Sequence, residues 1–70
     1  MVREDDLWIT KHAADKMLTE GISTKDICRV LERGSKFHQT DGYLAVYGYV
    51  SVAYKKVGTK YKVKTVFINK

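Results

Sequence analysis

The sequence has no proline and a single cysteine, Cys28, among its 70 residues. One cysteine excludes an intrachain disulfide and any zinc site built from a cysteine cluster. A short chain without disulfides fits a reducing compartment, and the charged residues 1–6 lack the apolar core of a signal peptide. No apolar run approaches the roughly 18 residues that a membrane span needs. We therefore expect one cytoplasmic, globular domain over residues 1–70, in which residues 1–8 form a flexible or edge-packing N-terminal segment.

Acidic residues are nearly absent from the second half of the chain. Of the eight acidic residues, only Asp41 lies within residues 36–70, so the whole excess behind the net charge of +5 belongs to that half. A basic surface of this kind favours a polyanion such as nucleic acid as the partner. The alternative is that the lysines keep exposed strands soluble and block pairing at the sheet edges.

Two helices are predicted in the first half of the chain. Over residues 11–20 the apolar residues recur at helical spacing, with Thr10 as the N-cap and Gly21 as the left-handed residue that ends the helix. A capping box that begins at Ser23 opens the second helix, which Gly34 ends. Because a very short linker joins the two helices, we expect an αα-corner or hairpin.

After residue 34 the apolar period changes to two, which is typical of strands. Asp41-Gly42 and Gly58-Thr59 are hairpin turn signals. Around Gly48 the chain either forms one long bent strand or a hairpin with a three-residue loop, Tyr47–Tyr49, because both keep the apolar residues on one face. The fold class is therefore α+β, with two N-terminal helices packed on a three- to four-stranded antiparallel sheet. These turns pair Phe37 with Val46, Tyr54 with Val63, Val52 with Thr65, and Val50 with Phe67.

This register divides the strand residues between two faces. The predicted core face comprises Phe37, Leu44, Val46, Val50, Val52, Tyr54, Val63 and Phe67. The opposite face carries tyrosines, a histidine and lysines, with two apolar residues, Val66 and Ile68, near the end of the chain. Aromatic rings stack on unpaired bases and lysines neutralise phosphates, so this face is predicted to bind RNA. The nucleic-acid-binding candidates are Lys36, His38, Tyr43, Tyr47, Tyr49, Lys55, Lys62 and Lys64.

A ribonuclease that works without a metal needs a base, an acid and cations, and His, Lys and Tyr side chains can supply them. His12 and Lys16 stand four residues apart on the first helix and share a face. Tyr54 and Thr65 are their candidate neighbours on the inner face of the sheet. The catalytic hypothesis therefore rests on these four residues. The two histidines and the cysteine show no metal-ligand spacing, so we expect neither a metal nor another cofactor.

Several motifs in this chain resemble a known family. His12-Ala13-x-x-Lys16-Met17, Gly21-Ile22-Ser23 and Val63-Lys64-Thr65-Val66 occur in order, and they are similar to the pattern H-A-x-x-R-M, R-G-I-S and V-x-T-V of a family of small prokaryotic domains of unknown function. The resemblance extends from about Ile9 to Ile68. That family is usually placed beside the RelE and BrnT toxins, which share helices packed on an antiparallel sheet.

The resemblance implies a RelE-toxin-like fold and a metal-independent endoribonuclease that acts on RNA. Under a separate protein-interaction hypothesis, the sheet or its edge would hold a partner chain such as a small antitoxin-like protein. Lys16 replaces an arginine of the pattern and so loses the planar fork that suits phosphate, while Glu20 replaces a second arginine and reverses its charge. The alternative functions are a non-catalytic RNA-binding module and a protein-interaction module, both of which would use the Tyr/Lys-rich face of the sheet.

Overall fold

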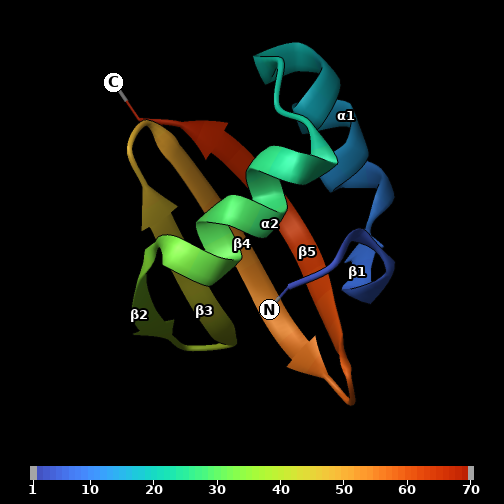
Figure 1. Cartoon of the computed structure of the whole chain (residues 1–70), viewed down its shortest axis with the longest axis vertical. Coiled ribbons are helices and arrows are strands. Elements are labelled where there is room, and N and C mark those ends of the chain that lie inside the picture. Colours follow the sequence, from blue (N-terminus) through green and yellow to red (C-terminus); the bar gives the residue numbers. More distant parts are fainter. Residues whose placement is uncertain (1, 70) are drawn as a thin grey trace.

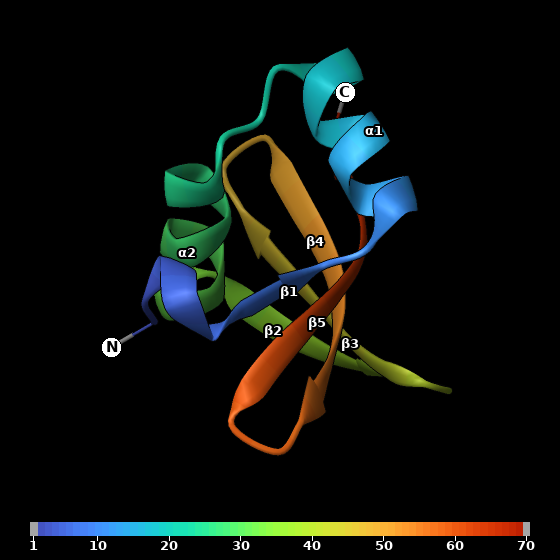
Figure 2. The same ribbon diagram turned by 90° about the vertical axis from the view of Figure 1, so that its right-hand side faces the viewer.

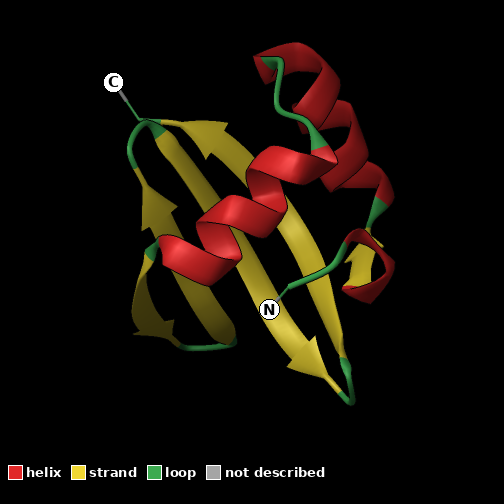
Figure 3. Cartoon of the chain, viewed as in Figure 1, coloured by secondary structure: helices red, strands yellow, loops and turns green. Residues whose placement is uncertain are grey.

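Two helices pack on one face of a five-stranded, mostly antiparallel sheet in the computed structural model, which describes residues 2–69 (Figure 1). This confirms the predicted α+β class. Figure 3 shows helices, strands and short connections along the chain. No helix within the described residues is long and apolar enough to cross a membrane. After a 3-10 turn, Glu4–Asp6, the elements are β1 (Leu7–Ile9), α1 (Lys11–Glu20), α2 (Thr24–Arg33), β2 (Ser35–Gln39), β3 (Gly42–Tyr47), β4 (Val50–Val57) and β5 (Lys60–Ile68).

Local capping sets the ends of the helices, as the sequence predicts. The Thr10 hydroxyl accepts a hydrogen bond from the Ala13 amide at 3.2 Å, and Gly21 ends α1 with φ of 70°. At the start of α2 the Ser23 hydroxyl accepts from the Asp26 amide at 3.2 Å, while the Asp26 carboxylate accepts from the Ser23 amide at 3.0 Å. This reciprocal pair satisfies two amides that the first turn leaves unpaired. The bonds from Ser23, main chain first, lower the pKa of the Asp26 carboxyl.

The strand order is β1-β5-β4-β3-β2, so the N-terminal strand lies beside the C-terminal one (Figure 2). Strand β1 runs parallel to β5, with Trp8 opposite Lys62, and the other three pairs are antiparallel. Where β1 gives way to α1, the Thr10 hydroxyl donates to the main-chain oxygen of Val63 at 2.8 Å. The segment before α1 therefore extends one edge of the sheet, and β2 forms the other.

The hairpin between β2 and β3 turns one residue earlier than predicted. Its loop residues are Thr40 and Asp41, and Gly42 already belongs to β3. A tight type I′ turn centred on Asp41-Gly42 needs positive φ at both residues, whereas only glycines have positive φ within residues 2–69. The pairing therefore slides by two residues, so that Phe37 lies opposite Leu44.

The chain around Gly48 forms a further hairpin, which is neither a bent strand nor a three-residue loop. Gly48 and Tyr49 are its two loop residues, and φ of 60° at Gly48 suits the first central position of a type II′ turn. Tyr47 pairs with Val50 across this loop. Even-numbered residues of β3 therefore share a face with odd-numbered residues of β4. The common face predicted for Leu44, Val46, Val50 and Val52 is wrong.

The hairpin between β4 and β5 has the predicted loop, Gly58-Thr59, and Tyr54 faces Val63 as predicted. A β-bulge then breaks the register, because Ala53 pairs with Thr65 and Lys64 is left as an extra residue of β5. Beyond the bulge the partner of Val52 is Val66 and the partner of Val50 is Ile68, where Thr65 and Phe67 were expected.

These registers define an inner face, which carries both helices, and an outer face. Val52, Tyr54 and Val63 of the predicted core are buried on the inner face. Phe37, Leu44, Val46 and Phe67 instead lie on the outer face, because the turns and the bulge reverse their parity. Ala45 and Val66 occupy the inner face in their place. The buried hydrophobic cluster comprises Ala13, Ile22, Ile27, Val30, Leu31, Ala45, Val52, Tyr54, Val63 and Val66.

Candidate functional site

The outer face of the sheet lies open, since both helices pack on the inner face (Figure 2). Two aromatic side chains on it are well exposed, Phe37 at 53% and Trp8 at 49%. A sheet face of this kind combines flat apolar surface with charge. Away from the β4–β5 turn, its apolar and basic members, together with one threonine, are Trp8, Phe37, Leu44, Val46, Ala53, Lys55, Lys62, Lys64, Thr65 and Phe67.

Three lysines gather toward one end of the outer face. Lys55 on β4 pairs with Lys62 on β5, which in turn pairs with Trp8 on β1. The Lys62 ammonium nitrogen lies 4.9 Å from the centroid of the Trp8 ring, within cation–π range. Directly paired residues have Cβ atoms about 5 Å apart, so like charges at these positions repel one another. An anion bound among them would relieve that repulsion.

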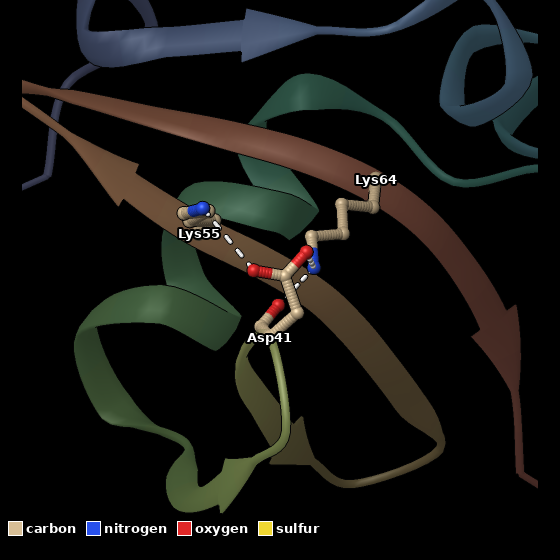
Figure 4. Close-up of polar contacts among 3 residues, drawn as sticks. All are labelled: Asp41, Lys55 and Lys64. Carbon is tan, nitrogen blue, oxygen red and sulfur yellow. Dashed lines mark hydrogen bonds and ion pairs between the residues drawn. The ribbon is translucent and has the colours of Figure 1, made fainter.

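Asp41 supplies such an anion in the free protein (Figure 4). Its Oδ1 lies 3.1 Å from the Lys55 ammonium nitrogen, and its Oδ2 lies 3.1 Å from that of Lys64. The Lys64 ammonium also donates to the main-chain oxygen of Asp41. The hydrogen bond from Lys64, followed by that from Lys55, lowers the pKa of the Asp41 carboxyl. The carboxylate therefore stays ionised well below neutral pH.

The predicted nucleic-acid-binding residues do not share one face. Lys55, Lys62 and Lys64 belong to the outer face, and Tyr49 lies in the loop between β3 and β4. The remaining four, Lys36, His38, Tyr43 and Tyr47, lie on the inner face. On β3, Tyr43 and Tyr47 lie two residues before and after the buried Ala45 and so share its face. On β2, Lys36 pairs with Ala45 and His38 pairs with Tyr43. The prediction of a single Tyr/Lys face is wrong, and the cause is the same parity reversal that moved the core residues.

Four aromatic rings form a row across the inner face. The His38 and Tyr43 rings meet edge to face at 5.0 Å, Tyr43 stacks on Tyr54 at 5.7 Å, and Tyr54 meets Tyr61 at 5.7 Å. The Lys56 ammonium lies 4.2 Å from the Tyr61 ring centroid. Burial, then the neighbouring phenols, raises the pKa of Tyr54. Tyr54 belongs to the buried core and Tyr61 packs against it, whereas His38 and Tyr43 are exposed at the β2 end of the row.

The four catalytic candidates are spread over different parts of the fold. His12 is exposed on α1, and one turn later the Lys16 ammonium forms an ion pair with Glu20 at 3.4 Å. Tyr54 is 6% exposed on the inner face, whereas Thr65 lies on the outer face opposite Ala53. The placement of Thr65 on the inner face is wrong, because the bulge turns it outward. Tyr54 and Thr65 cannot flank one substrate from the same side of the sheet.

A shallow groove runs along α2 beside the N-terminal segment. The charged side chains that line it are both basic and acidic, with no strong excess of either. Cys28 also lines the groove. Burial raises the pKa of this thiol, and the carboxylates of Glu4, Glu32 and Asp6 raise it further. The thiol is therefore a poor nucleophile near neutral pH. The lining residues are Val2, Arg3, Glu4, Asp5, Lys25, Cys28, Arg29, Glu32, Arg33 and Tyr47.

Iodoacetamide is expected to alkylate Cys28 more slowly in the folded protein than in urea at about pH 8, because less thiolate is present. Mass spectrometry of a reaction time course measures this rate. The pH profile separates the pKa effect from simple shielding, since a raised pKa moves the midpoint of the profile upward. A folded-state midpoint equal to that in urea would contradict this prediction.

Several members of the outer face were not predicted as site residues. Phe37 and Phe67 were assigned to the core, since only the true register reveals that they face outward. Asp41 was recognised only as a turn residue, although its position as the sole acid of the basic half was a usable signal. Residues 1–8 were expected to be flexible or to pack at an edge, but the sequence did not place Trp8 on the outer face, because that position depends on pairing with β5. Among the described residues there is no cluster of His, Cys, Asp or Glu that could hold a metal ion.

Fold and surface together define a small α+β domain whose sheet presents an open, apolar and basic outer face. Residues 9–68 match the family model described as Domain of unknown function (DUF4258), so the chain belongs to that family. No curated protein and no solved structure matches the chain.

Proposed function

We propose that this domain binds single-stranded RNA on the outer face of its sheet. The observation that carries the proposal is the uncovered face itself, where Trp8 lies beside Lys62 among three lysines and Phe37 is exposed at the opposite edge of the same face. Unpaired bases stack on such rings, and the lysines neutralise the phosphates between them. A duplex would hide its bases from a flat sheet, so a single strand is the better ligand.

Support for RNA as the nucleic acid comes from the resemblance of the His12, Gly21-Ile22-Ser23 and Thr65-Val66 motifs to domains placed beside the RelE and BrnT toxins. A relation to those toxins is part of this proposal, and the packing of two helices on one face of an antiparallel sheet is compatible with it. We also propose a cytoplasmic location, where RNA is present and the lone Cys28 stays reduced.

We propose binding without cleavage. A metal-independent endoribonuclease needs its base, acid and cations around one phosphate. His12 and Lys16 lie on α1, which packs on the inner face of the sheet, whereas the three lysines lie on the outer face. Lys16 is also paired with Glu20. Incubation of RNA with the protein in EDTA should yield no 2′,3′-cyclic phosphate ends. Such ends, lost in His12→Ala, would instead establish the nuclease.

Phe37→Ala is expected to weaken RNA binding roughly fivefold, because losing one stacking ring costs about 1 kcal/mol at the low end of its range. The probe is a fluorescein-labelled oligouridylate of about twelve nucleotides, a length within the site sizes of such surfaces. Fluorescence anisotropy gives its Kd. Leu18→Ala is the matched control, since Leu18 is an 85% exposed apolar residue on α1.

Equal affinities for Phe37→Ala, Leu18→Ala and the unmodified protein would contradict the stacking role of Phe37. Binding that does not weaken as salt rises would contradict the proposed RNA function altogether. If the protein binds no RNA and sediments as a dimer or with a small acidic partner, the outer face is a protein interface instead.

A further inference from the structure

The contacts of Asp41 have the form of a small anion site. Each carboxylate oxygen meets a different ammonium group, Oδ1 that of Lys55 and Oδ2 that of Lys64, both at 3.1 Å. The two lysines come from adjacent strands, and Asp41 reaches them from the tip of a third element, the β2–β3 hairpin (Figure 4). A phosphodiester likewise carries two non-bridging oxygens on one central atom, and each of them can accept a hydrogen bond from one ammonium group.

The fold holds this arrangement in two ways. A Cβ atom added to Gly42, which has φ of 120°, would lie 2.4 Å from the Tyr54 main-chain oxygen, so the hairpin tip sits closely against β4. The bulge supplies Lys64, which has no partner on β4. Bulges re-aim a side chain and occur often beside functional sites. The ammonium of Lys64 also donates to the main-chain oxygen of Asp41, and this contact does not depend on the carboxylate.

We propose that Lys55 and Lys64 form a phosphate subsite for the RNA backbone, and that the Asp41 carboxylate occupies this subsite in the free protein as an internal competitor. This inference rests on the proposed RNA-binding function. When RNA binds, the carboxylate rotates away and a phosphate takes its place. Lys64 keeps its main-chain contact with the hairpin tip and therefore remains in position.

The competitor is weak enough to be displaced. The side chains of Asp41 and Lys55 are 69% and 51% exposed, and that of Lys64 is 33% exposed. Ion pairs this open to water contribute little to stability. A phosphate of a bound strand is held in addition by its neighbours, through stacking and other lysines, so its effective concentration at the subsite is high. The carboxylate therefore lowers RNA affinity without abolishing it.

Asp41→Asn tests this inference directly. The amide keeps the size of the side chain and removes the negative charge, so RNA affinity is expected to rise roughly fourfold at about 0.15 M salt, the effect of one more phosphate contact. Glu20→Gln is the matched control, because Glu20 also pairs with a lysine, Lys16 at 3.4 Å, and its loss changes the net charge equally. It is expected to change RNA affinity much less.

The outcomes separate the two proposals. If the unmodified protein and both variants bind no oligouridylate, the proposed function fails and this inference fails with it. If the protein binds RNA in a salt-dependent way but Asp41→Asn and Glu20→Gln have equal effects, only the subsite is overturned. The inference would also be overturned if Asp41→Asn still raised RNA affinity in a protein that already carries Lys55→Gln and Lys64→Gln. In that background the lysines that the carboxylate blocks are absent.

A second measurement covers the case in which Asp41→Asn alters the hairpin. The ¹³C chemical shift of the Asp41 carboxyl carbon in the unmodified protein should move toward that of a solvent-exposed aspartate as the oligouridylate is added. An unchanged shift at saturating RNA would show that the carboxylate stays on the lysines, and it would overturn the inference.

Discussion

Replacing the outer-face lysines together, as Lys55→Gln, Lys62→Gln and Lys64→Gln, should weaken RNA binding roughly fiftyfold at about 0.15 M salt. Each positive charge lost from the RNA-binding surface removes about 0.7 from the slope of log K against log salt for a single strand, and three such losses multiply to this value. The slope itself should become less negative by about 2. Anisotropy titrations at several salt concentrations give both quantities.

The control for this triple variant removes the same charge from the helical layer. Lys11→Gln, Lys25→Gln and Arg29→Gln lower the net charge equally, and these three residues are exposed on α1 and α2. If affinity depended on net charge alone, the two triple variants would bind RNA equally weakly. A loss confined to the outer-face variant locates the phosphates on the sheet, whereas equal losses would contradict the proposed surface.

Gly34→Ala should lower the free energy of unfolding by about 2 to 3 kcal/mol, toward the upper end of the cost of overpacking. Gly34 has φ of −74°, a value open to any residue, so its backbone conformation does not require glycine. The space does, because an added Cβ would lie 2.5 Å from the Val30 main-chain oxygen and 2.7 Å from that of Val46. Both neighbours are backbone, so the last turn of α2 must shift away from β3.

Urea denaturation followed by circular dichroism measures this cost. A domain of this size has a total stability of only several kcal/mol, so the loss should lower the melting temperature by ten degrees or more. Gly21→Ala is the control, because Gly21 has φ of 70° but no atom near its missing Cβ. Its cost is conformational, about 1 kcal/mol. A smaller loss for Gly34→Ala than for Gly21→Ala would contradict the packing role of Gly34.

The helices were predictable because their signals are local. Thr10 and Gly21 bracket α1, and Ser23 with Asp26 opens α2, so hydrogen bonds over three or four residues settle where each helix begins. Gly34 was recognised as a helix end, but for an incomplete reason. Its missing side chain makes room for β3, a contact between segments twelve residues apart that no local pattern contains.

The faces of the sheet were not predictable from alternation alone. A strand residue changes face whenever a turn moves by one residue or an extra residue enters a strand. The turn at Gly48 and the bulge at Lys64 each did this, and their effects carried Phe37 and Phe67 to the outside and Val66 to the core. Apolar residues occupy both faces of this sheet, so either parity satisfied the sequence pattern.

For the candidate site, residue chemistry was easier to predict than placement. The prediction that the basic half of the chain offers a lysine-bearing sheet surface agrees with the positions of Lys55, Lys62 and Lys64. The tyrosines were grouped with them only through the wrong register. The role of Trp8 depends on the parallel pairing of β1 with β5, which has no signature in a segment of three residues.

That pairing also bears on the order in which the domain can assemble. The hairpins β2–β3, β3–β4 and β4–β5 join neighbouring segments, so closing them costs little chain entropy. Strand β1 must instead wait for β5, because Leu7 pairs with Tyr61 and Ile9 with Val63, more than fifty residues further along. On the ribosome, β1 therefore emerges before the other strands of this sheet and is among the last of them to find its place. The Trp8 end of the outer face is completed only after the entire sheet has been synthesised.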